Sequence, residues 1–491
     1  MAIRPLPITS PGFRGGQLGR IELLSDADMC LQRVAAVAPA GFGKTERIAG
    51  AVASPNARTL ILTHTNAGVR ALRQRIYSKE VPAFSYRVAT IAGWCESWVS
   101  TYRATTGYSS FAELKGASPS AYYPRVYAAM KKLLGCEWVA DSLKSSYSRV
   151  LVDEYQDCTM TQNELILSLS ETIPITVFGD PMQGIFYWTK DDQLVNWGCL
   201  NMPIRDMGGK PWRWINSGHE SLGRYVQEVR EMLLPTLDGR DVSLTLKTDC
   251  SDVQIISKDE LRKWQPERND GSAVFLSTIK GVQNGFSNRH HGFQSNEAVD
   301  NPEAKEFCER VDSEVGTDLA LVVLGFLGRC YTRMNQQMSS YVRHLKNGDF
   351  DFRRISKHSD VGRTLTVLES HSTIEAVWNI ISAVNECKDF RLYRGVLVWE
   401  VTKALELAME NQTTALEGLE LCRSRGVSFR DYCPFPRLSS RTVLSKGLEY
   451  DTSIVDVSSM PDPRDLYVAI SRCKKKLVLV SDCQTLQLRG I

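Results

Sequence analysis

Short apolar runs alternate with longer stretches of helical periodicity between residues 34 and 205. The clearest runs are residues 34–37, 59–62, 149–152 and 175–178, and polar or turn-forming residues follow each of them. A short run of mostly apolar residues between turn-forming residues is typical of a buried strand. Strands that alternate with helices build a parallel sheet, whose ligands bind at the carboxyl ends of the strands. The pattern therefore predicts an α/β domain.

A second set of strand-like runs lies in the other half of the chain, at residues 273–276, 452–457 and 476–481. A Gly-Gly pair at 208–209, followed by Pro211, is typical of a hinge between two domains. The second half is therefore predicted to be another α/β core with a parallel sheet.

Two segments interrupt the alternation, and both are predicted to be mostly helical insertions. The first is rich in Ser, Tyr, Ala and Lys, and the second is polar and helix-prone. The predicted boundaries are 1–99 and 146–207 for the first core, 100–145 for its insertion, 208–289 and 433–491 for the second core, and 290–432 for its insertion.

Composition changes this picture little. A chain of 491 residues can hold about three or four domains, and 43% apolar and 23% charged residues are ordinary for a globular protein. A net charge of +3 neither requires nucleic acid nor excludes it, so any nucleic-acid path must be a local groove. The thirteen cysteines form no CxxC pair, which argues against zinc ribbons and disulfide scaffolds. With no secretory signal and no membrane-length apolar run, we expect a cytoplasmic protein without a membrane partner.

The first candidate site is a phosphate-binding loop that joins the run at 34–37 to a helix-prone stretch. Its small residues let backbone N–H groups surround the phosphates, Lys44 reaches the β- and γ-phosphates, and the Thr45 hydroxyl binds Mg²⁺. A tight turn without a ligand is the alternative. The predicted nucleotide contacts in this loop are Ala38, Pro39, Ala40, Gly41, Phe42, Gly43, Lys44 and Thr45.

The second candidate site is acidic. Asp153 and Glu154 come directly after the run that ends at Val152. A phosphate-loop enzyme needs one carboxylate for Mg²⁺ and a second one to activate water, and Asp153 and Glu154 suit these two roles in that order. A solvated acidic turn is the alternative, and the upstream phosphate loop favours the functional interpretation.

Together with these sites, further segments resemble the motifs of the UvrD/Rep group of superfamily 1 helicases, in the order of that family. The similar segments are residues 38–45 (the phosphate loop), 62–75 (motif Ia), 90–98 (Ib), 153–157 (II), 179–188 (III), 212–213 (IV), 446–451 (V) and 467–472 (VI). The resemblance implies two RecA-like cores with ATP and Mg²⁺ between them.

The resemblance also implies roles for individual residues. Gln183 would sense the γ-phosphate and the attacking water, and Arg213 and Arg472 would close over the phosphates as cationic fingers. Ordinary surface arginines are the alternative for the last two. The catalytic set implied is Lys44, Glu154, Gln183, Arg213 and Arg472, with nucleotide contacts at Trp212 (adenine), Glu449 (ribose) and Gly447 (γ-phosphate).

Nucleic acid is expected to cross the carboxyl ends of both sheets. Hydroxyl and amide groups would bind phosphates, and aromatic rings would stack on bases whatever their sequence. Core aromatics under a loop are the alternative for the rings. The candidate contacts are Thr63, Thr65, Asn66, Trp94, Phe186, Tyr187, Trp188 and Thr442.

By resemblance, the chain is expected to be a DNA translocase or helicase that moves 3′ to 5′ and hydrolyses ATP in response to single-stranded DNA or DNA with single-stranded tails. Short stand-alone members of the family, such as those of Gabija-type phage defence, also imply a nuclease partner. Two alternatives remain, a DNA-sensing regulatory ATPase switch that controls such a nuclease and an RNA-directed enzyme of the same superfamily. The complete set of catalytic residues argues against an inactive site.

Overall fold

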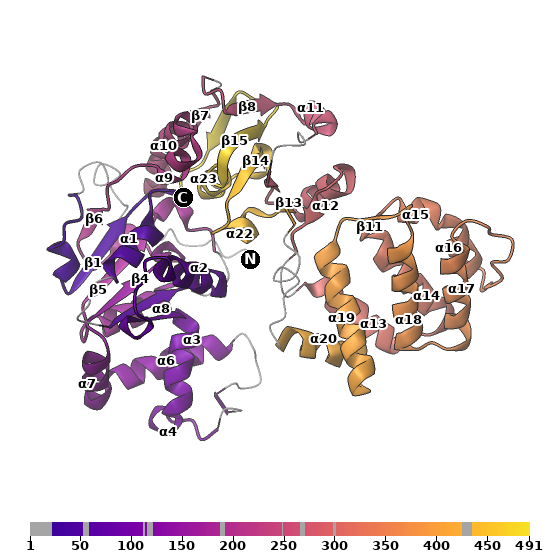
Figure 1. Ribbon diagram of the computed structural model, residues 1–491, viewed down its shortest axis with the longest axis horizontal. Coiled ribbons are helices and arrows are strands. Elements are labelled where there is room, and N and C mark those ends of the chain that lie inside the picture. Colours follow the sequence, from indigo (N-terminus) through magenta and orange to yellow (C-terminus); the bar gives the residue numbers. More distant parts are fainter. Residues whose placement is uncertain are drawn as a thin grey trace, which may run out of the picture.

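The computed structural model describes residues 22–52, 58–110, 113–114, 121–186, 192–247, 249–265, 271–297, 301–424 and 435–491. Figure 1 shows two sheet-containing cores, with the first at the left and the second above it, and a helical block at the right. Tyr187 and Trp188, two of the predicted base contacts, lie outside the described residues.

The first core is a six-stranded parallel sheet with the strand order β3-β2-β4-β5-β1-β6. Helices α1 (Lys44–Ala51) and α2 (Asn66–Tyr77) pack on one face, and α3 (Ile91–Thr101), α6 (Tyr122–Leu134) and α8 (Met160–Leu169) pack on the other. Because β4, β5 and β1 are neighbours, the loops after these strands meet at one edge. The strands are β1 (Arg33–Val37), β2 (Thr59–Thr63), β3 (Tyr86–Thr90), β4 (Arg149–Val152), β5 (Ile175–Gly179) and β6 (Ile204–Asp206).

The described residues between β3 and β4 are mostly helical. Helix α3 is followed by α4 (Arg103–Thr106), α6 and α7 (Glu137–Ser146), and the apolar faces of α3, α6 and α7 join the core on that side of the first sheet. Trp94 of α3 is completely buried there and packs edge-on against Trp98, with ring centroids 6.3 Å apart. The expectation that Trp94 contacts nucleic acid is therefore wrong for this structure, because the indole has no exposed surface.

Truncating the Trp94 side chain is expected to destabilise the first core. Trp94→Ala removes a large buried side chain and should lower the free energy of unfolding by about 3–5 kcal/mol, as large-to-small core changes do. Urea unfolding followed by circular dichroism measures this loss. Trp212→Ala, which truncates an indole that is 47% exposed, is the matched control and should change stability little. An equal midpoint for both variants would contradict the assignment of Trp94 to the core.

The second core is also a six-stranded parallel sheet, with the order β10-β13-β9-β14-β15-β8. Helices α10 (Glu220–Leu233) and α23 (Pro463–Ile470) pack on one face, and α11 (Lys258–Lys263) and α12 (Lys280–Arg289) pack on the other. The two parallel sheets with helices on both faces confirm the predicted α/β class. The strands are β8 (Val253–Ile256), β9 (Ala273–Leu276), β10 (Gln294–Ser295), β13 (Arg437–Ser440), β14 (Tyr450–Asp456) and β15 (Cys473–Val480); β7 (Val242–Thr245) and β16 (Thr485–Leu488) form a separate antiparallel pair.

The helical block has its own hydrophobic core and begins later than predicted. Strand β10 pairs with β13 in the second sheet, so the block starts at Pro302 rather than at residue 290. Residues 319–328 form the longest apolar run of the chain; they belong to α14 of this block and are largely buried. The helices are α13 (Pro302–Ser313), α14 (Gly316–Gly328), α15 (Met334–Gln337), α16 (Ser339–Lys346), α17 (Ser359–Ser370), α18 (Ile374–Glu386), α19 (Gly395–Asn411) and α20 (Ala415–Ser424), with the strand pair β11 (Tyr331–Thr332) and β12 (Arg391–Leu392).

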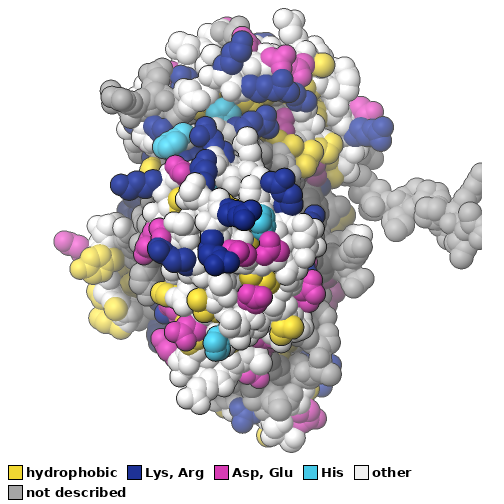
Figure 2. Space-filling view, turned by 90° about the vertical axis from the view of Figure 1, so that its right-hand side faces the viewer, with side chains coloured by type: hydrophobic (Ala, Val, Ile, Leu, Met, Phe, Trp, Pro, Cys, Tyr) yellow, Lys and Arg dark blue, Asp and Glu magenta, His cyan; other side chains and the backbone are white. Residues whose placement is uncertain are grey.

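Lys, Arg, Asp and Glu side chains are spread over the face of the molecule that Figure 2 shows, and hydrophobic side chains are scattered among them. Across the described ranges, the helices are too short or too polar to cross a membrane.

Candidate nucleotide site between the two cores

The phosphate loop lies between β1 and α1, as the sequence predicts. Gly41 and Gly43 have φ angles of +77° and +86°, a region that other residues rarely adopt. A Cβ on Gly41 would also lie 2.8 Å from the ring of Trp214, so the loop needs glycine there for space as well as for conformation. The loop therefore exposes backbone at the start of a helix, where N–H groups favour an anion.

Lys44 begins α1 and is buried against its own loop. Its Nζ donates to the carbonyl oxygens of Ala38 at 2.8 Å and Pro39 at 3.3 Å. Burial lowers the pKa of Lys44, and the nearby carboxylates of Glu154, Asp180 and Asp153 oppose that shift. A phosphate oxygen could replace these carbonyl oxygens as the acceptor of the Lys44 ammonium group.

The acidic pair stands at the carboxyl end of β4. Asp153 is buried, and one of its carboxylate oxygens accepts a hydrogen bond from the Glu154 N–H at 3.0 Å. Burial and the charge of Glu154 raise the pKa of Asp153 to about 7, against the effect of Lys44. For Glu154, burial acts to raise the pKa, but Lys446 and Lys44 outweigh it and hold the pKa below its usual value. The surroundings therefore favour the charged form of Glu154 more than that of Asp153.

The loop after β5 contacts the second core directly. The Gln183 amide donates to Asp180 at 3.1 Å, and Arg472 donates to the Gln183 side-chain oxygen at 3.4 Å. Asp180 has no exposed surface and forms an ion pair at 2.8 Å with Arg230 of α10. A change at the position of Gln183 can thus reach both cores through direct contacts.

Two arginines approach the site from the second core. Arg213, in α9 (Trp212–Ser217), forms an ion pair with Glu449 at 2.7 Å and donates to the Ser471 carbonyl. Arg472 is buried and donates to the Val468 carbonyl at 3.0 Å. Burial, with the like charge of Arg213, lowers the pKa of Arg472 to about 10, so its guanidinium remains charged at neutral pH. Neither group is the solvated surface arginine of the alternative interpretation.

A cavity of about 910 Å³ lies between the cores and brings the predicted catalytic residues together. The cavity is also lined by most of the predicted nucleotide contacts, whereas Ala38, Pro39 and Phe42 do not line it. Trp212 is 47% exposed and lines this cavity, with the edge of its indole ring beside Gly43. The predicted residues that line it are Ala40, Gly41, Gly43, Lys44, Thr45, Glu154, Gln183, Trp212, Arg213, Gly447, Glu449 and Arg472.

Several residues in the cavity were not predicted as site residues. Lys474 and Lys475 line it from the start of β15, and both form ion pairs with Asp451, at 3.7 and 3.1 Å. The run of three lysines after Arg472 and Cys473 was the available signal in the sequence. Arg75, in the last turn of α2, also lines the cavity; it ends the segment similar to motif Ia, but no role was assigned to it.

The predicted nucleic-acid contacts divide into exposed and buried groups. Thr65 and Asn66 are exposed at the start of α2, where the Thr65 hydroxyl also caps the helix by accepting from the Gly68 N–H at 3.0 Å. Thr63, at the end of β2, and Thr442, at the start of α22 (Thr442–Ser445), are buried. For these two threonines, direct phosphate contact is wrong for this structure.

Phe186 is also buried instead of exposed for base stacking. The ammonium group of Lys446 lies 4.8 Å from the centroid of its ring. The same ammonium forms an ion pair with Asp157 at 2.5 and 2.6 Å and donates to the Gln183 carbonyl. Lys446 of the second core therefore joins three positions of the first core, a role that its place in the sequence does not reveal.

Removing the Lys446 ammonium is expected to weaken the contact between the cores. Lys446→Met keeps the length of the side chain but leaves the Asp157 carboxylate buried without its cation, which should destabilise the protein by about 3–5 kcal/mol. The midpoint of urea unfolding measures the effect. Lys475→Met, whose ion pair is more exposed, is the matched control and should shift stability by less than about 1 kcal/mol. Equal shifts would show that the buried ion pair does not hold the cores together.

Comparison with known proteins gives one family. Residues 108–193 match the model of the UvrD/REP helicase N-terminal domain. The matched segment includes β4, the acidic pair at Asp153 and Glu154, and Gln183. None of the curated proteins compared with the chain matches it.

Proposed function

Because residues 108–193 match the model of the UvrD/REP helicase N-terminal domain, we propose that the chain is a UvrD-like superfamily 1 motor that hydrolyses ATP with Mg²⁺ and moves along single-stranded DNA. The cavity between the cores is the observation that carries this proposal. Lys44, Glu154 and Gln183 line it from the first core, and Arg213 and Arg472 line it from the second. A nucleotide in this cavity would contact both cores, so its binding and hydrolysis can change their relative position.

The residues present fit a nucleotide with its metal ion. Gly41 and Gly43 leave the loop backbone open, Lys44 is available to phosphate oxygens, and Thr45 and Asp153 are hard oxygen ligands suited to Mg²⁺. When bound, Mg²⁺ supplies positive charge to the phosphates. Glu154 would accept the proton of the attacking water, and Gln183 would orient that water. Arg213 and Arg472 would stabilise negative charge that develops on the phosphoryl group.

Trp212 is proposed to stack on the adenine ring. Trp212→Ala should raise the KM for ATP by roughly 5- to 150-fold, which corresponds to the 1–3 kcal/mol of aromatic stacking on a base. Steady-state hydrolysis over a range of ATP concentrations gives KM and kcat separately. If Trp212 had only a structural role, its replacement would lower kcat or the stability of the protein instead of raising KM alone. An unchanged KM would remove Trp212 from the nucleotide site.

Movement along DNA is tested directly by displacement of streptavidin from biotin at either end of a single-stranded oligonucleotide. A motor that moves 3′ to 5′ displaces streptavidin from the 5′ end in the presence of ATP and not from the 3′ end. Glu154→Gln is the inactive control. Displacement from the 3′ end would reverse the proposed direction. Hydrolysis without displacement from either end would favour the other proposal, a DNA-sensing ATPase switch that acts on a nuclease partner.

A further inference from the structure

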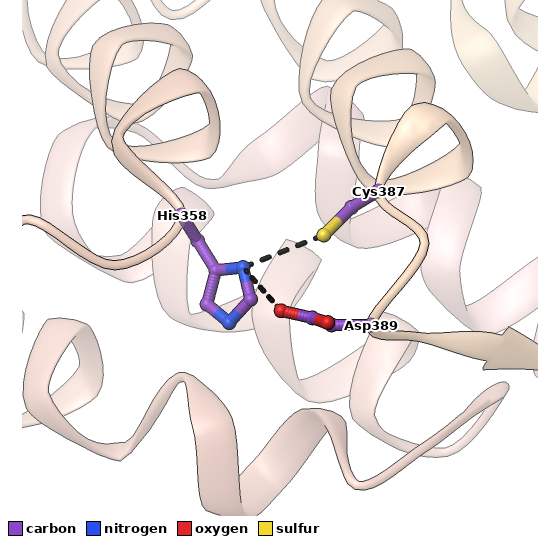
Figure 3. Close-up of side chains that lie close together, drawn as sticks. All are labelled: His358, Cys387 and Asp389. Carbon is purple, nitrogen blue, oxygen red and sulfur yellow. Dashed lines mark hydrogen bonds and ion pairs between the residues drawn. The ribbon is translucent and has the colours of Figure 1, made fainter.

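The helical block carries a cluster of three ligand-type side chains that the nucleotide site does not use. Figure 3 shows that His358, Cys387 and Asp389 converge on one point. His358 directly precedes α17, Cys387 directly follows α18, and Asp389 lies in the short connection to β12. Because α17 and α18 pack against each other and are joined by a short loop, the start of one helix lies beside the end of the other.

The three donor atoms lie at separations that suit one metal ion. The Nδ1 atom of His358 lies 3.4 Å from the Cys387 Sγ and 3.9 Å from an oxygen of Asp389, and all three atoms are within 4.8 Å of one another. A tetrahedral ion with bonds of 2.0–2.3 Å holds its ligand atoms about 3.3–3.8 Å apart. Small side-chain movements therefore suffice for all three atoms to reach one ion.

A catalytic Cys–His–Asp relay does not fit this arrangement. Such a relay needs the thiol and the carboxylate on opposite nitrogens of the imidazole ring, so that one nitrogen takes a proton while the other is held. Both groups here face Nδ1 (Figure 3). A simple hydrogen bond accounts for the contact between His358 and Cys387, but the 3.9 Å separation from Asp389 is too long for one.

The surroundings hold His358 as a neutral and fixed ligand. Its side chain is 3% exposed, its ring packs on Phe390 with centroids 4.7 Å apart, and its carbonyl accepts from the Tyr341 hydroxyl at 3.1 Å. Burial lowers the pKa of His358, with Lys357 acting in the same direction and Asp389 opposing. A neutral imidazole, a thiolate and a carboxylate would balance the charge of a divalent cation.

We propose that His358, Cys387 and Asp389 form a zinc-type site that ties the start of α17 to the end of α18. The sulfur and imidazole ligands favour Zn²⁺ over Mg²⁺ or Ca²⁺. Asp389 is 60% exposed, so solvent can supply a fourth ligand. The Nε2 atom of His358 is buried without a hydrogen-bond partner in the described part of the chain. A hydrogen-bond partner on the second ring nitrogen of a metal-binding histidine typically raises metal affinity 10- to 100-fold. Without one, this site should bind its metal ion more weakly than a closed structural zinc site.

Titration of the full chain with Co²⁺, after removal of metals with a chelator, tests the site. The expected result is binding of one Co²⁺ equivalent with a thiolate-to-cobalt charge-transfer band that Zn²⁺ abolishes. Cys387→Ser should remove the band, and Asp389→Asn, a change at an exposed side chain, should weaken Co²⁺ binding about 10-fold or more. Cys483→Ser, at an exposed cysteine away from the cluster, is the matched control and should keep the band.

Thermal unfolding provides a second measurement. Zn²⁺ should raise the unfolding midpoint of the unmodified chain and of Cys483→Ser, and it should leave Cys387→Ser unchanged. Absence of the charge-transfer band, or its persistence in Cys387→Ser, would overturn the proposal. Both readouts are independent of ATP hydrolysis, so failure of the metal site leaves the proposed motor function untouched.

Discussion

Replacing Glu154 with glutamine is expected to lower kcat for ATP hydrolysis by about 10²–10⁴-fold, the usual effect of losing a general base. The amide has the size of the carboxylate but cannot accept the proton of the attacking water. Glu154 lines the cavity, and Lys446 and Lys44 keep its carboxylate charged. Binding of ATP should persist, because the predicted phosphate contacts of Lys44 and Thr45 are unchanged. Steady-state hydrolysis and equilibrium binding of a fluorescent ATP analogue measure the two quantities separately.

Glu46→Gln is the matched control for this variant. Glu46 lies in the first turn of α1 and lines the same cavity, but its carboxylate forms ion pairs with Arg75 and Lys79. This variant should keep nearly full turnover. Comparable loss in both variants would mean that negative charge in the cavity, and not a base at position 154, supports hydrolysis.

The second large effect is expected at Arg472. Replacing it with alanine should lower kcat by about 10³–10⁵-fold, the range for an arginine that stabilises phosphoryl transfer. The guanidinium is buried in the second core and reaches Gln183 of the first core at 3.4 Å. Lysine should not rescue the activity, because a single ammonium cannot replace the several directed N–H groups of arginine.

Because Arg472 also donates to the carbonyls of Val468 and Leu448 and to the Ser471 hydroxyl, its variants need a test of folding. Far-ultraviolet circular dichroism and retained ATP binding serve this purpose. Arg75→Ala, which removes an arginine that lines the cavity from α2, is the matched control and should lower kcat by less than 10-fold. A folded Arg472→Lys variant with normal turnover would contradict the assigned role.

The sequence predicts those parts of the fold and the site that depend on local patterns. Buried strands appear as apolar runs, and in a parallel sheet the loops after them meet at one edge. The phosphate loop and Glu154 could therefore be placed at one edge of the sheet, and the resemblance to the helicase family added Gln183. The resemblance to the helicase motifs predicted that Arg213 and Arg472 face this edge from the second core. All of these residues line the same cavity.

Other features depend on tertiary packing and leave no local signal. Trp94 and Phe186 are aromatic residues beside motifs, a pattern that suits both base stacking and core packing, and burial decides between them. The ion pair of Lys446 with Asp157 joins residues 289 positions apart in the chain. The cluster of His358, Cys387 and Asp389 arises from the pairing of α17 with α18, so its spacing matches no zinc motif in the sequence.

Steady-state ATP hydrolysis with and without single-stranded DNA, and with single-stranded RNA of the same length, tests the central claim most directly. The two-core site predicts Mg²⁺-dependent turnover that single-stranded DNA stimulates strongly and that Glu154→Gln abolishes. Stimulation by RNA and not by DNA would mean that the substrate of the motor is RNA. Turnover that is the same with and without nucleic acid, or no turnover at all, would contradict a DNA motor.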